Sequence, residues 1–556
     1  MFVPELRPWR AARPHVVRVT DAVRPRLARA AGIVRPRLAR VAATARPRVA
    51  RLTRAAKPQL ARLTGTGPNA RSWQYGAGAA TVGLALAAGV VTVAGPWDST
   101  GQRTAERDRA TALARTGGGD HGRTADSSRT SDTAAGAPRP APSAASVLVG
   151  LGGGGADVVV KSAPDALPTG AGVASVLTPL LADPVLGARH AAAVVDVATG
   201  RHLYGAGAGT GLTPASTTKI ATAVAALSAM GGEHRLTTRT VLEPDTRELV
   251  LVGGGDPTLT ARDDDGAGWA GLRTLAASSA AALKKRGLTH VTLSYDTTLY
   301  AGSEVHPIGP NGNLARVTAL SADEGRPDDS TSGPVTRVPD PAADATRTFA
   351  AFLKADGITT TPPGPSKATT RAKSLASVSS PPLSVLVERM LTNSDNDIAE
   401  ALARHTALAT GVRADFAGGG AAVRAQLKKL GLPTAGVRIM DGSGLDRQDR
   451  ITANLLTALL VKAGDPARPG LRPVLTGLPV AGFTGTLADR YADGAAGVVR
   501  AKTGTLTGVN ALAGTVVDQD GRLLAFAFLA SGTTDAGAAQ AALDRAATAL
   551  AGCGCR

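Results

Sequence analysis

The hydrophobic and polar positions divide the chain into four stretches of different character. Residues 1–75 carry isolated aliphatic side chains among many arginines and prolines, whereas residues 76–96 contain no charged side chain. Residues 97–165 are mostly small or polar and show little periodic apolar content, which is typical of a disordered linker. Only from residue 166 onward do apolar residues recur with the periods of strands and helices, so we expect the folded part there.

Strand patterns occur at both ends of the folded part. Residues 190–197 predict a strand, followed by a turn at Thr199-Gly200 and a returning strand from His202. Three alternating segments near the C-terminus predict an antiparallel meander over 498–504, 510–517 and 523–531. Helical patterns follow Pro214 and recur at 271–285, 340–357, 383–408 with a break at 393–396, 416–430 and 535–550.

This order of elements predicts an α+β domain whose antiparallel sheet is flanked by helices. Short strands at 248–252 and 290–294, mixed with helices and many turn residues, predict an accessory domain inserted into it. We expect the insertion at 246–374, and the main domain to comprise 166–245 and 375–556.

The net charge of +18 lies almost entirely in the first stretch. Residues 1–75 contain 17 Lys or Arg and two acidic residues, a balance of +15, so the rest of the chain carries only +3. A folded part with so small an excess of positive charge lacks the strongly basic character of a nucleic-acid enzyme, and we expect no nucleic acid as a partner.

The basic stretch is also repetitive. Its prolines recur every 11 residues from Pro14 to Pro58, and residues such as Leu27 and Leu38 recur on one face of a helix with this period. Such an amphipathic tract could lie on an anionic membrane surface. A disordered basic tail that only fixes membrane topology is the alternative, and the repeat does not decide between the two.

The uncharged stretch at 76–96 has the length of a membrane span. Its 21 residues are flanked by Trp73, Tyr75 and Trp97 as interfacial aromatics. A cleaved secretory signal is the alternative, because Val93-Ala94-Gly95 offers small residues, but a 75-residue lead is far too long for one. We therefore expect an uncleaved, single-pass anchor in the cell membrane, with the N-terminus in the cytoplasm and the folded part outside.

The cysteines and histidines give no sign of a metal or redox centre. Cys553 and Cys555 lie in the last four residues, and a Cys-Gly-Cys at a frayed end is expected to be incidental. A core without cysteine needs no disulfide framework. The histidines, His306 and His405 among them, show no ligand spacing and are expected to be structural, so we predict no metal and no cofactor.

The most informative stretch follows Pro214, which stands where a helix tolerates proline. If a helix begins near Ser216, then Ser216 and Lys219 share a face. A buried lysine can lose its proton and serve as the base that a serine nucleophile needs. Ser-x-x-Lys arises often by chance, however, and a capping serine beside a solvated lysine is the ordinary interpretation of it.

Two further motifs change that interpretation. Ser394-Asp395-Asn396 lies in the break between two helical segments, and Lys502-Thr503-Gly504-Thr505 lies on a strand that precedes another strand. Ser-x-x-Lys, Ser-Asp-Asn and Lys-Thr-Gly together form the signature of penicillin-binding proteins and class A β-lactamases. All three occur here in that order, each in the expected structural setting.

From about residue 170 to 550 the chain resembles the class C, low-molecular-mass penicillin-binding proteins, which are D-alanyl-D-alanine carboxypeptidases and endopeptidases. The resemblance extends to further segments at Leu251–Leu259, Asp340–Ala342, Ser380–Leu383, Asp441–Leu445 and Gly485–Leu487. The long gap between the first two motifs also resembles this family, which inserts accessory domains there. The resemblance implies a serine β-lactamase/DD-peptidase-like fold, substrates that are peptidoglycan stem peptides ending in D-Ala-D-Ala, and β-lactams as covalent inhibitors.

The resemblance also implies roles for the motif residues. Ser216 would form the acyl-enzyme, Lys219 would be its base, and Ser394 could relay a proton to the leaving amine. Asn396 would hold Lys219 and the substrate amide. Lys502 and Thr503 would bind the terminal carboxylate, Gly504 lets the substrate backbone approach, and the N–H groups of Ser216 and Thr505 would form the oxyanion hole.

Three alternatives remain at the level of sequence. A class A β-lactamase would need a deacylating glutamate, and no Glu-x-x-Leu-Asn stretch follows Ser394. A membrane-tethered sensor that is acylated without turnover is a second alternative, although Ser216, Lys219 and Lys502 are intact. The arginine-rich tail leaves open a third, a cytoplasmic scaffold. Sequence alone does not separate carboxypeptidase from endopeptidase activity.

Overall fold

The computed structural model describes residues 168–262, 268–491 and 494–556. The predicted basic tail, membrane anchor and linker therefore lie outside the described residues. Within the described part of the chain, no helix combines the length and the apolar character that crossing a bilayer requires.

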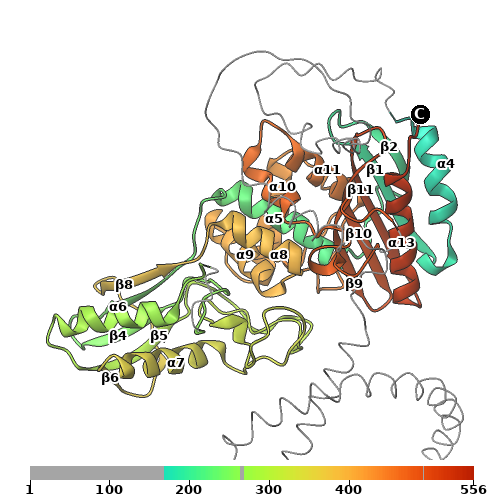
Figure 1. Cartoon of the computed structure of the whole chain (residues 1–556). Coiled ribbons are helices and arrows are strands. Elements are labelled where there is room, and N and C mark those ends of the chain that lie inside the picture. The colour runs from blue at the N-terminus through green and yellow to red at the C-terminus, as the bar shows by residue number, and fades with distance from the viewer. Residues whose placement is uncertain (1–167, 263–267, 492–493) are drawn as a thin grey trace, which may run out of the picture. The chain divides into compact units, whose positions relative to one another are not determined.

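The main sheet has five antiparallel strands and joins the two ends of the folded part (Figure 1). Its strands are β1 (Arg189–Asp196), β2 (His202–Ala206), β9 (Val499–Leu506), β10 (Val509–Val517) and β11 (Leu523–Ser531). They are ordered β2-β1-β11-β10-β9, so the predicted meander is confirmed and the N-terminal hairpin completes its sheet through the β1–β11 pair. Strand β9 lies at one edge of this sheet.

Helices cover both faces of this sheet (Figure 1). Along β11, Phe526 and Phe528 pack toward one core, and Ala527 and Leu529 toward the other, with the period of two that a strand imposes. The first core is closed by α4 (Gly170–Leu181) and α13 (Ala536–Ala551). The second is closed by α5 (Thr218–Met230), α8 (Leu383–Asn393), α9 (Asn396–Ala409), α10 (Phe416–Lys429), α11 (Ala453–Gly464) and α12 (Pro473–Thr476).

A second sheet forms the inserted accessory region. It contains β3 (Thr237–Leu242), β4 (Glu248–Val252), β5 (His290–Asp296), β6 (Thr359–Thr360), β7 (Gly364–Pro365) and β8 (Lys373–Ser379). Its order is β6-β5-β4-β3-β8, with β7 on β5, and it packs against α6 (Leu272–Lys284) and α7 (Pro341–Ala355). The sheet extends past the expected 246–374 at both ends, because β3 and β8 pair with each other. Single-turn helices complete the fold at Pro184–Leu186, Ala215–Thr217, Asp323–Gly325, Pro469–Leu471 and Gly485–Leu487.

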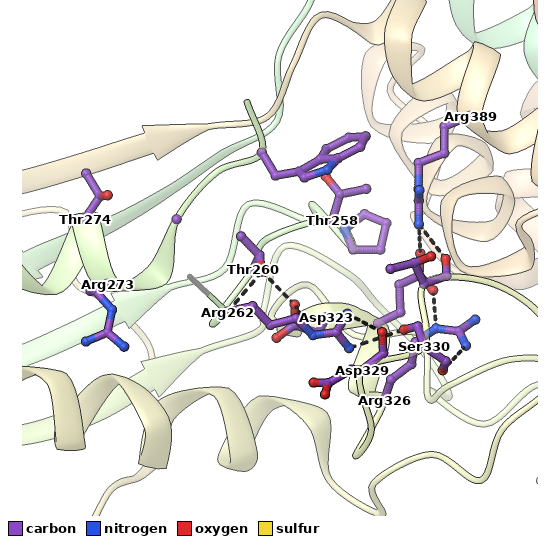
Figure 2. Close-up of a pocket in the computed structure, with 15 residues that line it drawn as sticks. Thr258, Thr260, Arg262, Arg273, Thr274, Asp323, Arg326, Asp329, Ser330 and Arg389 are labelled. Carbon is purple, nitrogen blue, oxygen red and sulfur yellow. Dashed lines mark hydrogen bonds and ion pairs between the residues drawn. The ribbon is translucent and has the colours of Figure 1, made fainter. Parts of the chain in front are cut away.

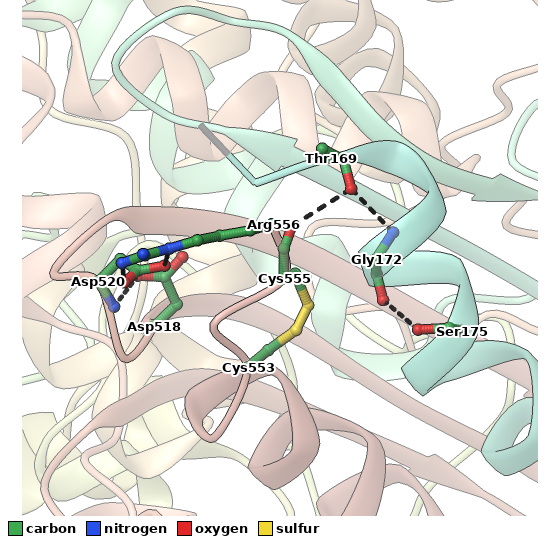
Figure 3. The surroundings of a disulfide bond; sticks show 8 residues. All are labelled: Thr169, Gly172, Ser175, Asp518, Asp520, Cys553, Cys555 and Arg556. Atoms are coloured by element: carbon green, nitrogen blue, oxygen red, sulfur yellow. Dashed lines mark hydrogen bonds and ion pairs between the residues drawn. A yellow bond between two sulfur atoms is a disulfide. The ribbon is translucent and has the colours of Figure 1, made fainter. Parts of the chain in front are cut away.

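The C-terminal end is packed rather than frayed, which corrects the expectation for its two cysteines (Figure 3). Cys553 and Cys555 are joined by a disulfide bond, and both are buried in the core closed by α4 and α13. The N–H of Thr169 donates a hydrogen bond to the Cys555 carbonyl at 2.6 Å. A Cβ atom at Gly172 would lie only 2.7 Å from the same carbonyl oxygen, so the end of the chain lies directly against the start of α4.

Candidate active site

Ser216 lies in the single helical turn Ala215–Thr217, directly before α5. The α-helix thus begins two residues later than expected, but Ser216 still lies one turn before Lys219. Ala215 has a φ of 49°, in the left-handed region that few residues other than glycine adopt. This turn leaves Ser216 half-buried, whereas the Lys219 side chain is fully buried behind it.

The Lys219 ammonium group contacts three oxygen atoms from different parts of the chain. Its Nζ atom lies 3.0 Å from the Ser216 Oγ, 2.6 Å from the Asn396 Oδ1 and 2.8 Å from the Ser443 carbonyl. Burial lowers the pKa of Lys219 to about 8, although the carboxylates of Asp441 and Glu400 act in the opposite direction. A fraction of Lys219 is therefore neutral near physiological pH, and a neutral amine can accept the serine proton.

The second motif occupies the break between α8 and α9. Ser394 ends α8 with a φ of 58°, and the Asp395 side chain caps α9 by accepting a hydrogen bond from the Ile398 N–H at 3.0 Å. Asn396 is the first residue of α9. Its Oδ1 atom faces Lys219, and its Nδ2 atom donates to the carbonyl of Asn313 in the accessory region at 2.8 Å.

The third motif lies on the edge strand β9. Lys502 is fully buried, and its Nζ atom donates to the Thr503 carbonyl at 3.0 Å. Burial, reinforced by the charge of Lys219, lowers the pKa of Lys502 well below its ordinary value. The Thr503 hydroxyl lies 3.0 Å from that of Thr486. A Cβ atom on Gly504 would lie 2.6 Å from the Pro214 carbonyl, so only glycine lets β9 pack this closely against the turn that carries Ser216.

The three motifs meet at one cavity of about 250 Å³. Its lining includes Ser216, Ser394, Asn396 and Thr505. The side chains of Lys219 and Lys502 are fully buried. Lys219 contacts Ser216 and Asn396, which line the cavity. The structure thus brings the expected nucleophile, base and Ser-Asp-Asn residues together, with Thr505 of β9 on the same cavity.

Three residues near Lys219 were given no role by the sequence. The Glu400 carboxylate accepts hydrogen bonds from the N–H groups of Gly442 and Ser443, which fixes the backbone whose carbonyl faces Lys219. Asp441 accepts from the N–H groups of Gly444 and Asp446 in the same loop. His306 donates to Asp441. Glu400 follows Asn396 by four residues on α9, and this helical spacing is the signal that could have revealed it.

Two buried groups of side chains bring three potential metal ligands within 4.8 Å of one another: His306, Glu400 and Asp441, and Glu324, Asp395 and Asp397. In both groups, carboxylate oxygens already accept hydrogen bonds from backbone N–H groups or pair with arginine or histidine. Hydrogen bonds and ion pairs account for both arrangements, and we assign no metal to either.

A larger cavity of about 380 Å³ lies between the accessory region and α8 and shares Arg326 with the first (Figure 2). Its arginines are engaged within the protein. Arg262 pairs with Asp323 at 3.5 Å, Arg326 pairs with Glu324 at 2.8 Å, and the Arg389 guanidinium lies 5.2 Å from the centre of the Trp269 ring. Among the described residues that line it, none belongs to the three motifs.

Comparison with known proteins agrees with this geometry. The model of the D-Ala-D-Ala carboxypeptidase 3 (S13) family matches residues 173–328 and 320–550. A carboxypeptidase of Mycobacterium tuberculosis is 36% identical over 75% of this chain and 90% of its own length. A carboxypeptidase of Mycolicibacterium smegmatis is 36% identical over 70% of this chain and 85% of its own length.

The fold is also found among solved structures. Penicillin-binding protein 4 of Haemophilus influenzae matches with a TM-score of 0.54 and 21% identity, over 67% of this chain and 97% of that protein. The architecture is thus a DD-peptidase/β-lactamase-like α+β fold with an extra domain. Because the family model covers most of the chain, including all three motifs, the chain belongs to the D-Ala-D-Ala carboxypeptidase 3 (S13) family.

Proposed function

We propose that this serine D-Ala-D-Ala carboxypeptidase/endopeptidase acts through an acyl-enzyme formed on Ser216, with Lys219 as the base. One observation carries the assignment: the buried Nζ of Lys219 lies 3.0 Å from the Ser216 Oγ, and burial lowers the pKa of Lys219 to about 8. A serine hydroxyl is a weak nucleophile at neutral pH unless a base accepts its proton.

The arrangement supports the following reaction. The Ser216 Oγ attacks the carbonyl carbon of the penultimate D-Ala while its proton passes to the Lys219 Nζ. The N–H groups of Ser216 and Thr505 would stabilise the resulting oxyanion, and such a donor contributes about 3–4 kcal/mol. The proton then reaches the leaving amine through Ser394, and D-alanine departs. Water hydrolyses the ester and restores Ser216.

Lys502 and Thr503 bind the terminal carboxylate of the substrate. Burial lowers the pKa of Lys502, and the charges of Lys219 and Arg490 lower it further. A bound carboxylate supplies the missing negative charge, so substrate binding favours the ammonium form of Lys502. The same contact selects peptides with a free C-terminus and the carboxylate of β-lactams, which we propose as covalent inhibitors of this enzyme.

Release of D-alanine tests the proposal. The purified full chain is incubated with a peptide that ends in D-Ala-D-Ala and with crosslinked muropeptides, beside the Ser216→Ala variant. We expect the wild type to release D-alanine or cleave crosslinks and the variant to lose at least about 1,000-fold in rate. A wild type that is acylated by penicillin but releases no product would instead be a sensor.

We further propose that residues 76–96 anchor the enzyme in the cell membrane, with the folded part outside the cell. The support is the 21-residue uncharged stretch, its flanking aromatics and the +15 charge before it. Protease added to intact cells should digest the folded part and leave a membrane-bound N-terminal fragment. Protection of the folded part, or its release into the medium, would contradict this topology.

A further inference from the structure

Residues 303–317 form one of the segments through which the accessory region reaches the active site. The Asn313 carbonyl accepts a hydrogen bond from Asn396, and the Ala315 N–H donates to Asp397 at 2.9 Å. The buried guanidinium of Arg404 in turn donates to the Ser303 carbonyl at 3.0 Å, which ties the start of this segment to α9. The segment is therefore a fixed part of the site rather than a remote insertion.

His306 makes a further buried contact with the site. Its side chain is buried, and its Nε2 atom lies 3.0 Å from the Asp441 Oδ2 and 3.9 Å from the Glu400 Oε1. The Ile308 N–H donates to Nδ1 at 3.3 Å, which leaves Nε2 to carry the proton that Asp441 accepts. The ring packs edge-to-face on Phe416 with 4.9 Å between centroids, and this contact together with the hydrogen bonds of both ring nitrogens fixes its orientation.

The loop that His306 contacts bears directly on the catalytic lysine. Asp441 and Glu400 together accept from the N–H groups of Gly442, Ser443, Gly444 and Asp446. This leaves the Ser443 carbonyl 2.8 Å from the Lys219 Nζ. A Cβ atom on Gly444 would overlap the Ala215 carbonyl, so the same loop also packs against the turn that carries Ser216.

Two buried carboxylates side by side repel each other, and each needs donors to remain ionised. Burial and Asp441 raise the pKa of Glu400 to about 7. The hydrogen bond with Asp441 and the charge of Glu400 raise the pKa of His306 above its ordinary value.

The charged groups that face His306 are Asp441 and Asp446 from the loop and Glu400 from α9, and Arg404 lies beyond it, stacked on Phe416. Those around Lys219 are Asp441, Glu400, Asp395 and Asp397, with Lys502 on β9.

We infer that His306 is a positioning residue for the reaction, which acts through its hydrogen bond to Asp441 to hold the 441–446 loop against Lys219. The inference deepens the proposed function and rests on it. Its consequence is that the accessory region contributes to acylation, because without His306 the Asp441 carboxylate lacks one donor and interacts more strongly with the ammonium form of Lys219.

Three variants of the full chain test the inference. His306→Phe keeps a flat ring on Phe416 but removes the donor, and His306→Gln keeps an N–H donor. His405→Phe is the matched control, since His405 is also buried but packs on Tyr300. For each, the rate of acylation by a labelled penicillin is measured against pH, and thermal unfolding shows whether the variant folds.

We expect His306→Phe to acylate about 10- to 100-fold more slowly and its rate to begin rising at higher pH than in the wild type. His306→Gln should stay within about 3-fold of the wild type, and His405→Phe should leave the pH profile in place. The inference alone would be overturned if His306→Phe were acylated at the wild-type rate. It would also be overturned if His306→Phe and His306→Gln lost acylation rate equally and their pH profiles did not shift. A wild type that is not acylated at Ser216 would overturn the proposed function with it.

Discussion

Two effects act in opposite directions on the pKa of Lys219. Full burial favours the neutral amine, which a base requires, whereas the surrounding carboxylates favour the ammonium form, and the outcome is a pKa of about 8. Asn396 and the Ser443 carbonyl hold the Nζ atom against the Ser216 Oγ in either protonation state. The side chain is thereby both positioned for proton transfer and able to lose its proton near physiological pH.

The first prediction concerns the pH dependence of acylation. Because only neutral Lys219 accepts the serine proton, kcat for a saturating D-Ala-D-Ala peptide, whose carboxylate keeps Lys502 protonated, should rise about tenfold per pH unit below 8 and level off above it. Lys219→Arg, which keeps a cation that cannot deprotonate, should lose at least about 1,000-fold at every pH. Steady-state kinetics between pH 6 and 10 measure both. A rate that is flat across this range would exclude Lys219 as the base.

The motif residues could be predicted from sequence because each lies within a short, characteristic string. The spacing of Ser216 and Lys219 puts them on adjacent turns whatever the rest of the chain does. Glu400, Asp441 and His306 carry no such local signal, since three separate segments bring them together. A histidine without ligand spacing was expected to be structural, and only the fold shows that it donates to the loop beside Lys219.

At the scale of elements, the site depends on how closely strand β9 approaches the turn before α5. The Lys-Thr-Gly segment lies on an edge strand, and Gly504 packs closely against Pro214.

Elements with a clear pattern, such as β4, β11 and α10, were predicted to within a residue. Strand β8 has the sequence Lys-Ser-Leu-Ala-Ser-Val-Ser, and its few apolar residues are too weak a pattern to reveal an exposed edge strand. The apolar run of α11 does not by its pattern distinguish a helix from a buried strand.

Gly504→Ala tests the packing of β9. A Cβ atom 2.6 Å from the Pro214 carbonyl would force the strand and the nucleophile turn apart, so acylation should fall by about tenfold or more. Gly470→Ala is the control, because nothing lies within 4 Å of its Cβ position. Penicillin-labelling rates and thermal midpoints are compared for the two. Equal rates in both variants would show that the close approach is unimportant for catalysis.

The junction between the accessory region and α9 should be sensitive to alkaline pH. Burial and the neighbouring Asp395 carboxylate raise the pKa of Glu324 to about 9, from an unfolded value near 4.5, although the Arg326 guanidinium 2.8 Å away acts in the opposite direction. When the pKa of a carboxyl group is higher in the folded chain than in the unfolded chain, its contribution to the stability of the folded chain is fully present at pH values below the pKa of the unfolded chain. This contribution is lost as the pH rises through the pKa of the folded chain.

Glu324→Gln removes this dependence. The thermal unfolding midpoint of the variant should equal that of the wild type near pH 5 and should lie about 5 °C or more above it at pH 9. Asp329→Asn, which removes an exposed carboxylate from the same segment, should follow the wild type at both pH values. Parallel curves for wild type and Glu324→Gln would mean that Glu324 is already ionised in the folded chain.

At the scale of the whole molecule, the fold brings the carboxylates of Glu400 and Asp441 close to Lys219, where they favour its ammonium form and are not positioned to activate water. Glu400 and Asp441 are buried behind the lysine and are engaged by backbone N–H groups. We therefore propose that Lys219 or Ser394 is the base for the water that enters after D-alanine leaves.

This arrangement predicts a contrast between substrates. D-alanine departs and frees the leaving-group side of the cavity, whereas the leaving group of penicillin is tethered by its ring and stays there. The peptide acyl-enzyme should therefore be hydrolysed at least about 100-fold faster than the penicilloyl-enzyme, a difference of about 2.7 kcal/mol in barrier. Mass spectrometry of both adducts over time gives the two rates. Penicillin hydrolysis as fast as D-alanine release would make the protein a β-lactamase.

The most direct test of the central claim is to locate the acylated residue. The full chain is treated with a labelled penicillin, digested and mapped by mass spectrometry, beside Ser216→Ala. We expect the adduct on Ser216, in the peptide that also contains Lys219, and no adduct in the variant. An adduct on another residue, or labelling of Ser216→Ala at the wild-type rate, would contradict the assignment of Ser216 as the nucleophile.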